Sequence, residues 1–377
     1  MRVPFNRPYA TQRELGYIAQ AIVNNHLSGS GPFTKRCEQW LEEHIGSARV
    51  LLTHSCSTAL DMAAILADLA PGDEVIMPAF TFVSTANACV LRGAVPVFVD
   101  VEPRTLNIDA AQIEPAITPK TRAIMPVHYA GTGCDMDAIL AIAKAHDLMV
   151  IEDAAQGILA TYRGRPLGSF GQMAALSFHE TKNIHSGEGG ALLINDPALV
   201  DRAEIVREKG TNRTQFFRGQ VDKYTWVDIG SSFLPSDMIA AFLWAQLEEA
   251  ESICERRRAI WKRYHELLEP LEAEGLIERP EVPEGRMIAG HIYFVLVKSL
   301  EVRTRTLQQL DERGVKAVFH YVPLDTSPAG QRYARAATEL SVTHDVSDRL
   351  LRLPLWPEMT DEQVVYVAQV LGEVLKG

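Results

Sequence analysis

Lys182 is the side chain with the clearest potential for chemistry in this sequence. It comes shortly after an apolar run at residues 173–176 and shortly before glycines at positions 187, 189 and 190. Such a run predicts a buried strand that ends at a cleft, and nearby glycines allow backbone to approach a ligand closely. A partly desolvated lysine loses some of its preference for the ammonium form and can attack a carbonyl group. On its own, however, a lysine at a strand end is usually a surface residue.

Asp153 gives Lys182 a chemical partner. It ends a second apolar run, at residues 148–153. In parallel α/β sheets, ligands gather at the carboxyl ends of the strands, so the two side chains are expected at one site. A carboxylate that faces the ring nitrogen of pyridoxal phosphate keeps it protonated, while a lysine carries the cofactor as a Schiff base. The pair therefore indicates pyridoxal phosphate, although an isolated aspartate at this place could equally be a helix cap.

Two predicted turns between a strand and a helix could complete such a site. The first carries Ser55, Ser57 and Thr58, whose hydroxyl groups could join the helix N-terminus in binding a phosphate. A plain N-cap is the alternative for this turn. The second turn carries Phe80 and Phe82, and either ring could stack on a flat cofactor or belong to the core.

The elements that would position these residues alternate along the first half of the chain. Short β-rich runs and longer helical patterns follow one another, which predicts an α/β fold with a mostly parallel sheet and crossover helices. The expected strands are residues 50–53, 74–77, 95–100, 122–127, 148–153, 174–178 and 191–195, and the expected helices are 57–69, 83–91, 136–146 and 197–209.

The second half of the chain predicts a smaller α+β domain. One long helix at about 236–268 is expected to join a large domain, residues 1–245, to a small one, residues 246–377. The polar stretch 209–224 is expected to be a long functional loop. In the small domain, strands are expected at 290–297 and 315–321, with helices at 304–313, 344–352 and 360–375.

Composition limits the class of protein. The chain has 377 residues and a net charge of −11, which disfavours nonspecific binding to nucleic acid or acidic membranes. Its first residues lack the apolar segment of a signal peptide, so a cytoplasmic location is expected. The five cysteines are scattered without a CxxC pair, which favours reduced thiols over disulfides or a zinc site.

Several short motifs together indicate a family. They are SFHETKN at 177–183, GEGG at 187–190, DAAQ at 153–156, TFVST at 81–85 and HYVPL at 320–324. The set resembles the DegT/DnrJ/EryC1 sugar aminotransferases, and the resemblance extends over nearly the whole chain. It implies the type I aminotransferase fold, pyridoxal phosphate as cofactor with pyridoxamine phosphate as its aminated form, and a homodimer with shared active sites.

The resemblance also implies roles for individual residues. Lys182 matches the Schiff-base lysine and Asp153 the partner of the ring nitrogen. Gln156 is expected near the ring and its phenolic oxygen, and Phe82 is expected to stack on the ring. The residues expected to hold the phosphate are Ser177 and the turn residues Ser55, Cys56 and Ser57.

One position departs from the family pattern. Most members have Gly-Tyr-Asn-Tyr-Arg where this chain has GSSFL at 230–234. Ser232 therefore replaces an asparagine that reaches the phosphate in the neighbouring subunit. Its hydroxyl can still donate one hydrogen bond, so Ser232 is included among the expected cofactor residues.

The resemblance implies a substrate as well. The segments KGTNR at 209–213, FFRGQVDKYTW at 216–226 and DIGSS at 228–232 are similar to members that aminate C4 of dTDP-4-keto-6-deoxyglucose with L-glutamate, which gives dTDP-4-amino-4,6-dideoxygalactose for a cell-surface polysaccharide. The pyrophosphate of such a substrate requires positive charge. The expected substrate residues are Arg213, Arg218 and Lys223 in the loop, with His320 and Tyr321 near the sugar.

Two alternatives remain open at the level of sequence. An aminotransferase for a UDP- or GDP-linked keto sugar, or one acting at C3, would share most of the motifs. A non-catalytic regulator or scaffold that binds pyridoxal phosphate would keep Asp153 and the phosphate turn but would not need Lys182. Relatives that dehydrate sugars carry histidine in place of the lysine, so Lys182 argues against that reaction.

Overall fold

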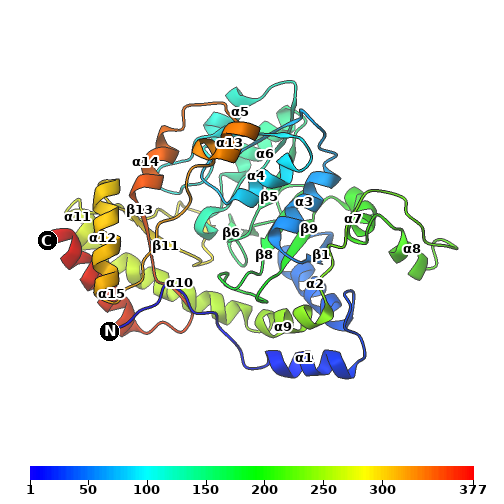
Figure 1. The fold of residues 1–377 in the computed structure, drawn as a ribbon, viewed down its shortest axis with the longest axis horizontal. Helices are drawn as coiled ribbons and strands as arrows, with labels where there is room; N and C mark the ends of the chain where they lie inside the picture. The colour runs from blue at the N-terminus through cyan, green and yellow to red at the C-terminus, as the bar shows by residue number, and fades with distance from the viewer.

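A mostly parallel sheet of eight strands forms the centre of the molecule, as the computed structural model of residues 1–377 shows (Figure 1). The strand order is β1-β9-β8-β5-β4-β2-β3-β12; β9 is antiparallel to both of its neighbours, and the other pairs are parallel. The predicted fold class and all seven strands predicted between residues 50 and 195 are confirmed. The strands of this sheet are β1 Arg49–Thr53, β2 Glu74–Pro78, β3 Val95–Val99, β4 Thr121–Ile124, β5 Met149–Asp153, β8 Met173–Ser177, β9 Gly190–Ile194 and β12 Arg335–Ala336.

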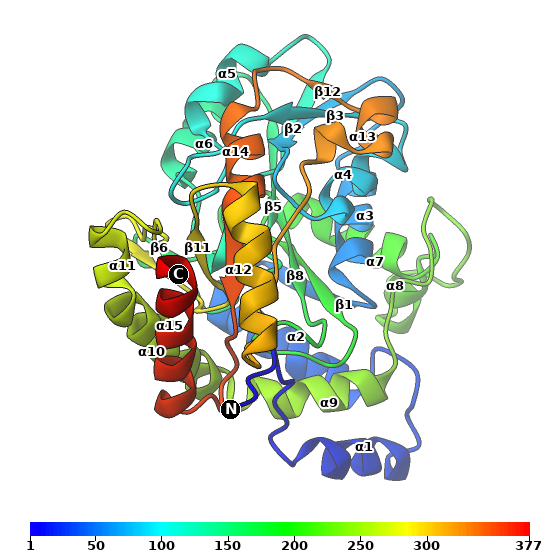
Figure 2. The same cartoon turned by 60° about the vertical axis from the view of Figure 1, so that its left-hand side comes forward.

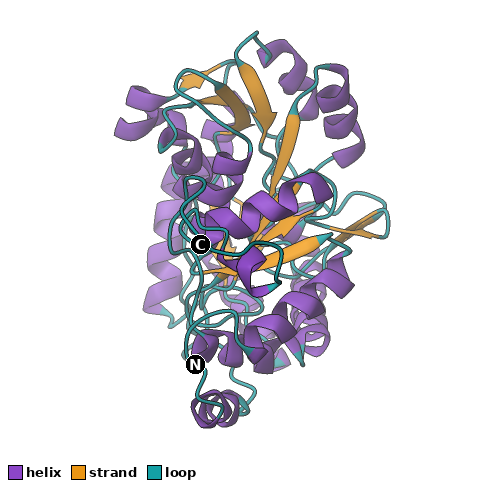
Figure 3. Ribbon diagram, turned by 90° about the vertical axis from the view of Figure 1, so that its right-hand side faces the viewer, coloured by secondary structure: helices purple, strands orange, loops and turns teal.

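Helices surround this sheet (Figure 3). The strands are buried on both faces, because one apolar cluster joins them to α3, α4 and α7, a second to α2 and α9, and a third to α6. Continuous apolar runs are typical of parallel strands covered on both sides, which is why these strands were predictable. The helices concerned are α2 Pro32–Ile45, α3 Cys56–Leu66, α4 Val83–Val90, α6 Met136–Ala145, α7 Val200–Arg207 and α9 Asp237–Leu247.

The single long helix predicted at 236–268 is wrong. The segment forms α9 and a second helix, α10 Ala250–Leu267. At the junction the Glu249 N–H donates to Gln246 O, three residues back, which tightens the turn and ends α9. The two helices serve different parts of the molecule, since α9 packs on α1 Glu14–Val23 and α2, whereas α10 packs on α15 Asp361–Lys376.

The C-terminal part has an apolar core of its own. The antiparallel strands β11 Tyr293–Leu296 and β13 Leu350–Leu353 lie against α10, α12 Leu300–Glu312 and α15 (Figure 2). Val3 is also buried in this core and bridges to Val315, so the first residues pack with the C-terminal part rather than with the large sheet. The predicted domain limits, 1–245 and 246–377, stay a prediction.

Two other predictions for this part are wrong. Residues 315–321 form single bridges, Val3 to Val315 and Val318 to Arg352, instead of a strand, because each neighbour offers only one pairing position. The helix predicted at 344–352 ends earlier: α14 spans Ser341–Arg349, and β13 follows directly. Residues 350–353 pair with β11, which requires extended backbone, and Pro354 disfavours helical backbone at Leu353.

The remaining elements are short. The segment around α8 stands out from the body of the molecule at the end away from the two termini (Figure 1). No helix combines the length with the apolar composition that crossing a bilayer requires. The other elements are α5 Ile113–Ala116, α8 Arg213–Phe217, α11 Glu269–Ala273, α13 Pro328–Tyr333, the strands β6 Thr161–Tyr162, β7 Arg165–Pro166 and β10 Arg286–Met287, and the 3-10 turns Ala110–Gln112, Tyr129–Gly131, Pro197–Leu199 and Leu324–Thr326.

Candidate active site

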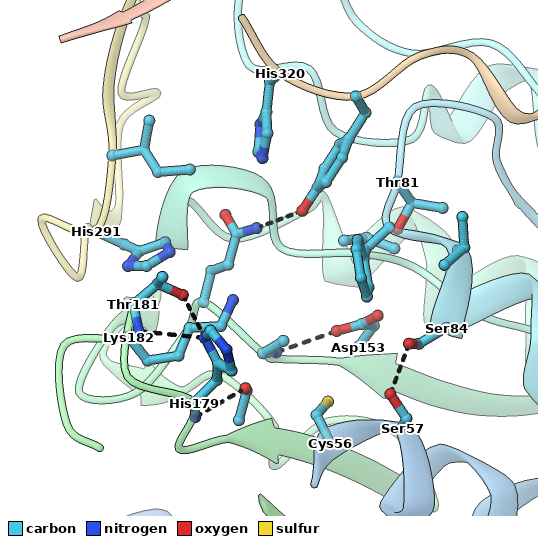
Figure 4. A pocket seen from close by; sticks show the side chains of 18 of the residues that line it. Cys56, Ser57, Thr81, Ser84, Asp153, His179, Thr181, Lys182, His291 and His320 are labelled. Carbon is cyan, nitrogen blue, oxygen red and sulfur yellow. Dashed lines mark hydrogen bonds between the residues drawn. The ribbon is translucent and has the colours of Figure 1, made fainter. Parts of the chain in front are cut away.

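A cavity of about 840 Å³ lies where the carboxyl ends of β5 and β8 face the C-terminal part of the chain. Figure 4 shows Lys182 and Asp153 in this cavity together with His291 and His320. The first two side chains come from the large sheet and the last two from the C-terminal part. The sequence prediction that Lys182 and Asp153 share one site therefore agrees with the geometry.

Lys182 lies in the loop between β8 and β9, where its backbone N–H donates to His179 O at 2.8 Å. Burial lowers the pKa of its amine. The negative charge of Asp153 acts in the opposite direction, while the positive charge of Arg352 adds to the lowering. The result is a larger share of neutral, nucleophilic amine than an ordinary lysine has.

Asp153 ends β5 and is only 5% exposed. Thr85 Oγ1 donates to one carboxylate oxygen at 2.8 Å, and the backbone N–H of Ala155 donates to the other at 3.1 Å. Neutral donors hold the carboxylate in place without cancelling its charge. The group is thus a fixed negative charge inside the cavity.

The predicted phosphate turn is the N-terminus of α3. Ser55 is its N-cap and accepts from Thr58 N–H at 3.2 Å. The first N–H groups of the helix have no acceptor inside it, and the helix dipole there favours an anion. Cys56 and Ser57 of this first turn line the cavity. Ser57 Oγ lies 2.6 Å from Ser84 Oγ, and Ser177 at the end of β8 lines the same cavity (Figure 4).

A glycine makes this turn possible. A Cβ atom on Gly190, at the start of β9, would lie 2.3 to 2.5 Å from backbone atoms of Ser55 and Cys56. Only glycine allows β9 to pass this close to the first turn of α3. The close approach fixes the turn beside the loop that carries Lys182.

The two aromatic candidates have different positions. Phe80 is 1% exposed and packs between Tyr129 and Tyr321, with ring centroids 5.3 and 5.5 Å away, so it belongs to the core. Phe82 is 56% exposed and lines the cavity as the N-cap residue of α4. It offers a free ring face. Gln156 donates to Tyr321 Oη at 3.0 Å and accepts from Ala130 N–H at 2.7 Å, which fixes its amide.

His320 and Tyr321 form the opposite wall. Their rings stack with centroids 3.6 Å apart, and His320 Nδ1 lies 2.6 Å from Tyr129 Oη. Burial lowers the pKa of His320 well below its usual value, and the charges of Arg352 and Lys182 lower it further. His320 is therefore a neutral ring. His179 also lines the cavity, and its Nδ1 lies 2.9 Å from Thr181 Oγ1.

Four predicted residues do not line the cavity of their own chain: Arg213, Arg218, Lys223 and Ser232. Arg213 packs on the Phe217 ring at 5.2 Å, and Arg218 is paired with Glu204 at 2.8 Å. Arg213, Arg218 and Lys223 lie on or beside the projecting segment around α8, whereas Ser232 forms a bridge with Glu208. Their contacts with substrate or cofactor stay a prediction, which for Ser232 concerns the cofactor of the neighbouring subunit.

The charged or polar lining residues that the sequence prediction missed include Arg257, His291 and Arg352. Arg257 donates to the carbonyl oxygens of Gly290 and His291, at 3.1 and 2.8 Å. Burial lowers the pKa of His291 well below its usual value. Of these three residues, only Arg352 could have been noticed in the sequence, because a charged residue there interrupts the apolar run at 350–356.

These residues fit pyridoxal phosphate. The helix N-terminus and hydroxyl groups suit its phosphate, Asp153 its ring nitrogen, Phe82 a ring face and Lys182 its aldehyde. Bound there, the cofactor would supply an electron sink for the carbanion that transamination requires. Fold and site together define an aminotransferase.

Comparison with known proteins identifies the family. Residues 8–372 match the model of the DegT/DnrJ/EryC1/StrS aminotransferase family, and the chain belongs to that family. It is 33% identical to the spore coat polysaccharide biosynthesis protein SpsC of Bacillus subtilis, over 100% of this chain and 97% of the relative. It is also 33% identical to the dTDP-4-dehydro-2,3,6-trideoxy-D-glucose 4-aminotransferase of Saccharopolyspora spinosa, over 97% and 95% of the two chains. Its identity to the GDP-perosamine synthase of Caulobacter vibrioides is 32%, over 99% and 98%.

Solved structures agree in fold over the full length. The aminotransferase TlmJ of Streptoalloteichus hindustanus superimposes with a TM-score of 0.91 at 28% identity, covering 100% of this chain and 99% of the other. A putative sugar aminotransferase of Streptococcus pneumoniae in its PLP form gives a TM-score of 0.91 at 26% identity, covering 100% and 99%. The type I aminotransferase fold predicted from the sequence is confirmed.

Proposed function

We propose that this protein is a nucleotide-sugar aminotransferase that uses pyridoxal phosphate and L-glutamate. The proposed acceptor is the C4 keto group of dTDP-4-keto-6-deoxyglucose, and the products are dTDP-4-amino-4,6-dideoxygalactose and 2-oxoglutarate. The observation that carries the proposal is that one cavity contains both Lys182 and Asp153. Burial lowers the pKa of the Lys182 amine, and two hydrogen bonds hold the Asp153 carboxylate in place. Membership of the family supports the same reaction class.

Lys182 would have two tasks in this reaction. Its amine would first bind the cofactor and then, once the amino acid has replaced it, move a proton from the donor Cα to the cofactor. A lowered pKa suits both tasks, because each requires the neutral amine at neutral pH. Asp153 would hold a proton on the ring nitrogen throughout.

The cavity's opposite wall would receive the sugar. His320 and Tyr321 offer a neutral ring and a hydroxyl group, which can contact sugar hydroxyls without adding charge. No side chain other than Lys182 is needed to move protons. His320 is therefore proposed as a substrate contact rather than as an acid or base.

The dTDP group and C4 are supported by similarity rather than by geometry. The name of the Saccharopolyspora spinosa relative includes both a dTDP-sugar and amination at position 4. The name of the Caulobacter vibrioides relative includes a GDP-sugar instead. A GDP-linked keto sugar is therefore the second candidate. The name of the Bacillus subtilis relative supports a role in polysaccharide synthesis.

A side-by-side assay tests the proposal. The cofactor-loaded protein is incubated with L-glutamate and with dTDP-, UDP- or GDP-linked 4-keto-6-deoxyglucose or 4-keto-6-deoxymannose, and 2-oxoglutarate and amino sugar are measured. Turnover is expected with the dTDP-sugar. Lys182→Ala should lower it on the order of 10³-fold or more, because the variant lacks the proton-transferring amine. Turnover with the GDP-sugar alone would favour the second candidate, and full activity of Lys182→Ala would contradict the mechanism.

A further inference from the structure

Arg352 is a charged residue of the cavity to which the proposed mechanism gives no task. It lies in β13, directly opposite Phe294 of β11. Its neighbours Leu351 and Leu353 are buried in the C-terminal core. Since successive side chains of a strand point to opposite faces, Arg352 points away from that core, and it lines the cavity that holds Lys182.

The guanidinium of Arg352 has no protein counter-charge. It packs on the Phe5 ring at 4.9 Å, and its buried Nε has no hydrogen-bond partner. Burial lowers its pKa, and the groups that raise it are the hydroxyls of Tyr129 and Tyr321 rather than a carboxylate. A half-buried arginine without an acceptor is costly to the folded protein, and a ligand that pairs with it removes the cost.

The other arginine of the cavity differs in this respect. The guanidinium of Arg257 donates hydrogen bonds to two backbone carbonyls, Gly290 O and His291 O. It supports the chain between α10 and β11 and has fewer donors left for a ligand. Arg352 is thus the guanidinium that is free to bind.

Only some ligands of this cavity have an anionic group in the right place. The phosphate of the cofactor is served by the N-terminus of α3 and the hydroxyls beside it. The keto sugar is uncharged around C4. An α-amino acid, however, must bring its amine to the cofactor carbon that Lys182 would hold, and it carries a carboxylate on the same carbon as that amine. Arg352 is close enough to this place for its charge to lower the pKa of Lys182.

We infer that Arg352 binds the α-carboxylate of the amino donor. This inference rests on the proposed function and adds the residue that selects an amino acid in the first half-reaction. Arginine suits the task because its planar fork can donate two parallel hydrogen bonds to one carboxylate. The same contact would orient the donor Cα toward Lys182.

The test separates the two half-reactions. With the protein in its pyridoxal phosphate form, bleaching of the visible cofactor band by L-glutamate reports donor binding. In the pyridoxamine phosphate form, recovery of the band with the keto sugar reports the acceptor. Arg352→Gln is expected to raise the apparent dissociation constant for glutamate about 10- to 100-fold, since a charge-assisted pair is lost. The acceptor half-reaction should change less than about threefold.

Two further variants and a binding measurement make the test specific. Arg352→Lys should keep part of the glutamate affinity, because it keeps the charge and loses the fork. Arg303→Gln is the matched control: Arg303 also packs on a phenyl ring, that of Phe319 at 5.5 Å, and has an unpartnered Nε, but it does not line the cavity. In the Lys182→Ala background, which lacks the proton-transferring amine, calorimetric titration of the pyridoxamine phosphate form with 2-oxoglutarate gives a readout independent of turnover.

Each outcome decides a point. Equal affinity of Arg352→Gln and wild type for glutamate and 2-oxoglutarate overturns the inference, and so does a loss confined to the sugar half-reaction. If wild type fails to react with glutamate yet binds 2-oxoglutarate through Arg352, the proposed function fails and the carboxylate site stands.

Discussion

The reactivity proposed for Lys182 depends on several charges at once. Burial lowers the pKa of its amine, Asp153 raises it, and Arg352 lowers it. The pKa of Lys182 is lowered because burial and Arg352 together outweigh Asp153. Each of the neighbours can be removed singly, so the balance can be tested.

The rate at which the apo protein binds pyridoxal phosphate covalently should report the pKa of Lys182, because only the neutral amine attacks the aldehyde. The rate is expected to rise with pH and to level off below the pH that an ordinary lysine requires, since the pKa is lowered. Asp153→Asn should move the midpoint to lower pH, because a charge that raises the pKa is gone. Arg352→Gln should move it to higher pH. Stopped-flow absorbance between pH 6 and 10 gives the midpoints.

Arg303→Gln serves as the control, and its midpoint should equal that of wild type, because Arg303 does not contribute to the pKa of Lys182. Midpoints that move in the same direction for Asp153→Asn and Arg352→Gln would contradict the electrostatic account. An unchanged midpoint in both would show that burial alone controls the amine.

At the scale of elements, the site depends on how closely β9 passes the first turn of α3. The contact brings the phosphate turn and the loop with Lys182 together from segments more than 100 residues apart in sequence. Gly190 is the position where this contact has no space for a side chain. The contact is therefore a point at which cofactor binding and stability are coupled.

Gly190→Ala is expected to destabilise the apo protein by about 1–3 kcal/mol, because the new Cβ would press on the backbone of Ser55 and Cys56. It should also weaken the binding of pyridoxal phosphate, since the displaced turn is the proposed phosphate site. Urea unfolding and cofactor titration measure the two effects. Gly16→Ala is the control: Gly16 lies in α1 with no atom within 4 Å of a new Cβ, so a gain of up to about 1 kcal/mol is expected. Unchanged stability of Gly190→Ala would refute the close-packing argument.

Element predictions from sequence succeeded where burial leaves a simple pattern. The strands between residues 50 and 195 are covered on both faces, so each is an apolar run in the sequence. The polar residues that follow or end two of these runs include Lys182 and Asp153, which line the cavity. The predictions failed where tertiary contacts decide: the predicted long helix divides into α9 and α10, which pack on different partners, and residues 315–321 pair with Val3 and Arg352 at single positions only. Arg352 escaped prediction because its role depends on which face of a short strand meets the cavity.

At the scale of the whole molecule, the projecting segment around α8 is the feature that a single chain leaves unexplained. It carries exposed aromatic side chains, with Phe217 70% and Trp226 76% exposed. It also carries the cations Arg213 and Lys223, which the cavity of the same chain does not use. Exposed apolar groups beside unused charges suit a second copy of the chain, which is the homodimer proposed from the family resemblance. The cations would then serve the neighbour's nucleotide sugar.

Mixing two variants that are impaired in different ways tests this sharing of sites. Arg213→Gln/Lys223→Gln should raise the KM for the nucleotide sugar about 10- to 100-fold, because charge-assisted contacts to the pyrophosphate are lost. Co-expressed with Lys182→Ala, it should regain about one quarter of wild-type activity at low sugar concentration, because about half of random dimers are mixed and each has one intact site. The control mixture is Lys182→Ala with Asp153→Asn, two residues of one chain's cavity, and it should stay inactive. Recovery in the control mixture but not in the first, or an unimpaired double variant, would show that the segment around α8 does not complete a neighbour's site.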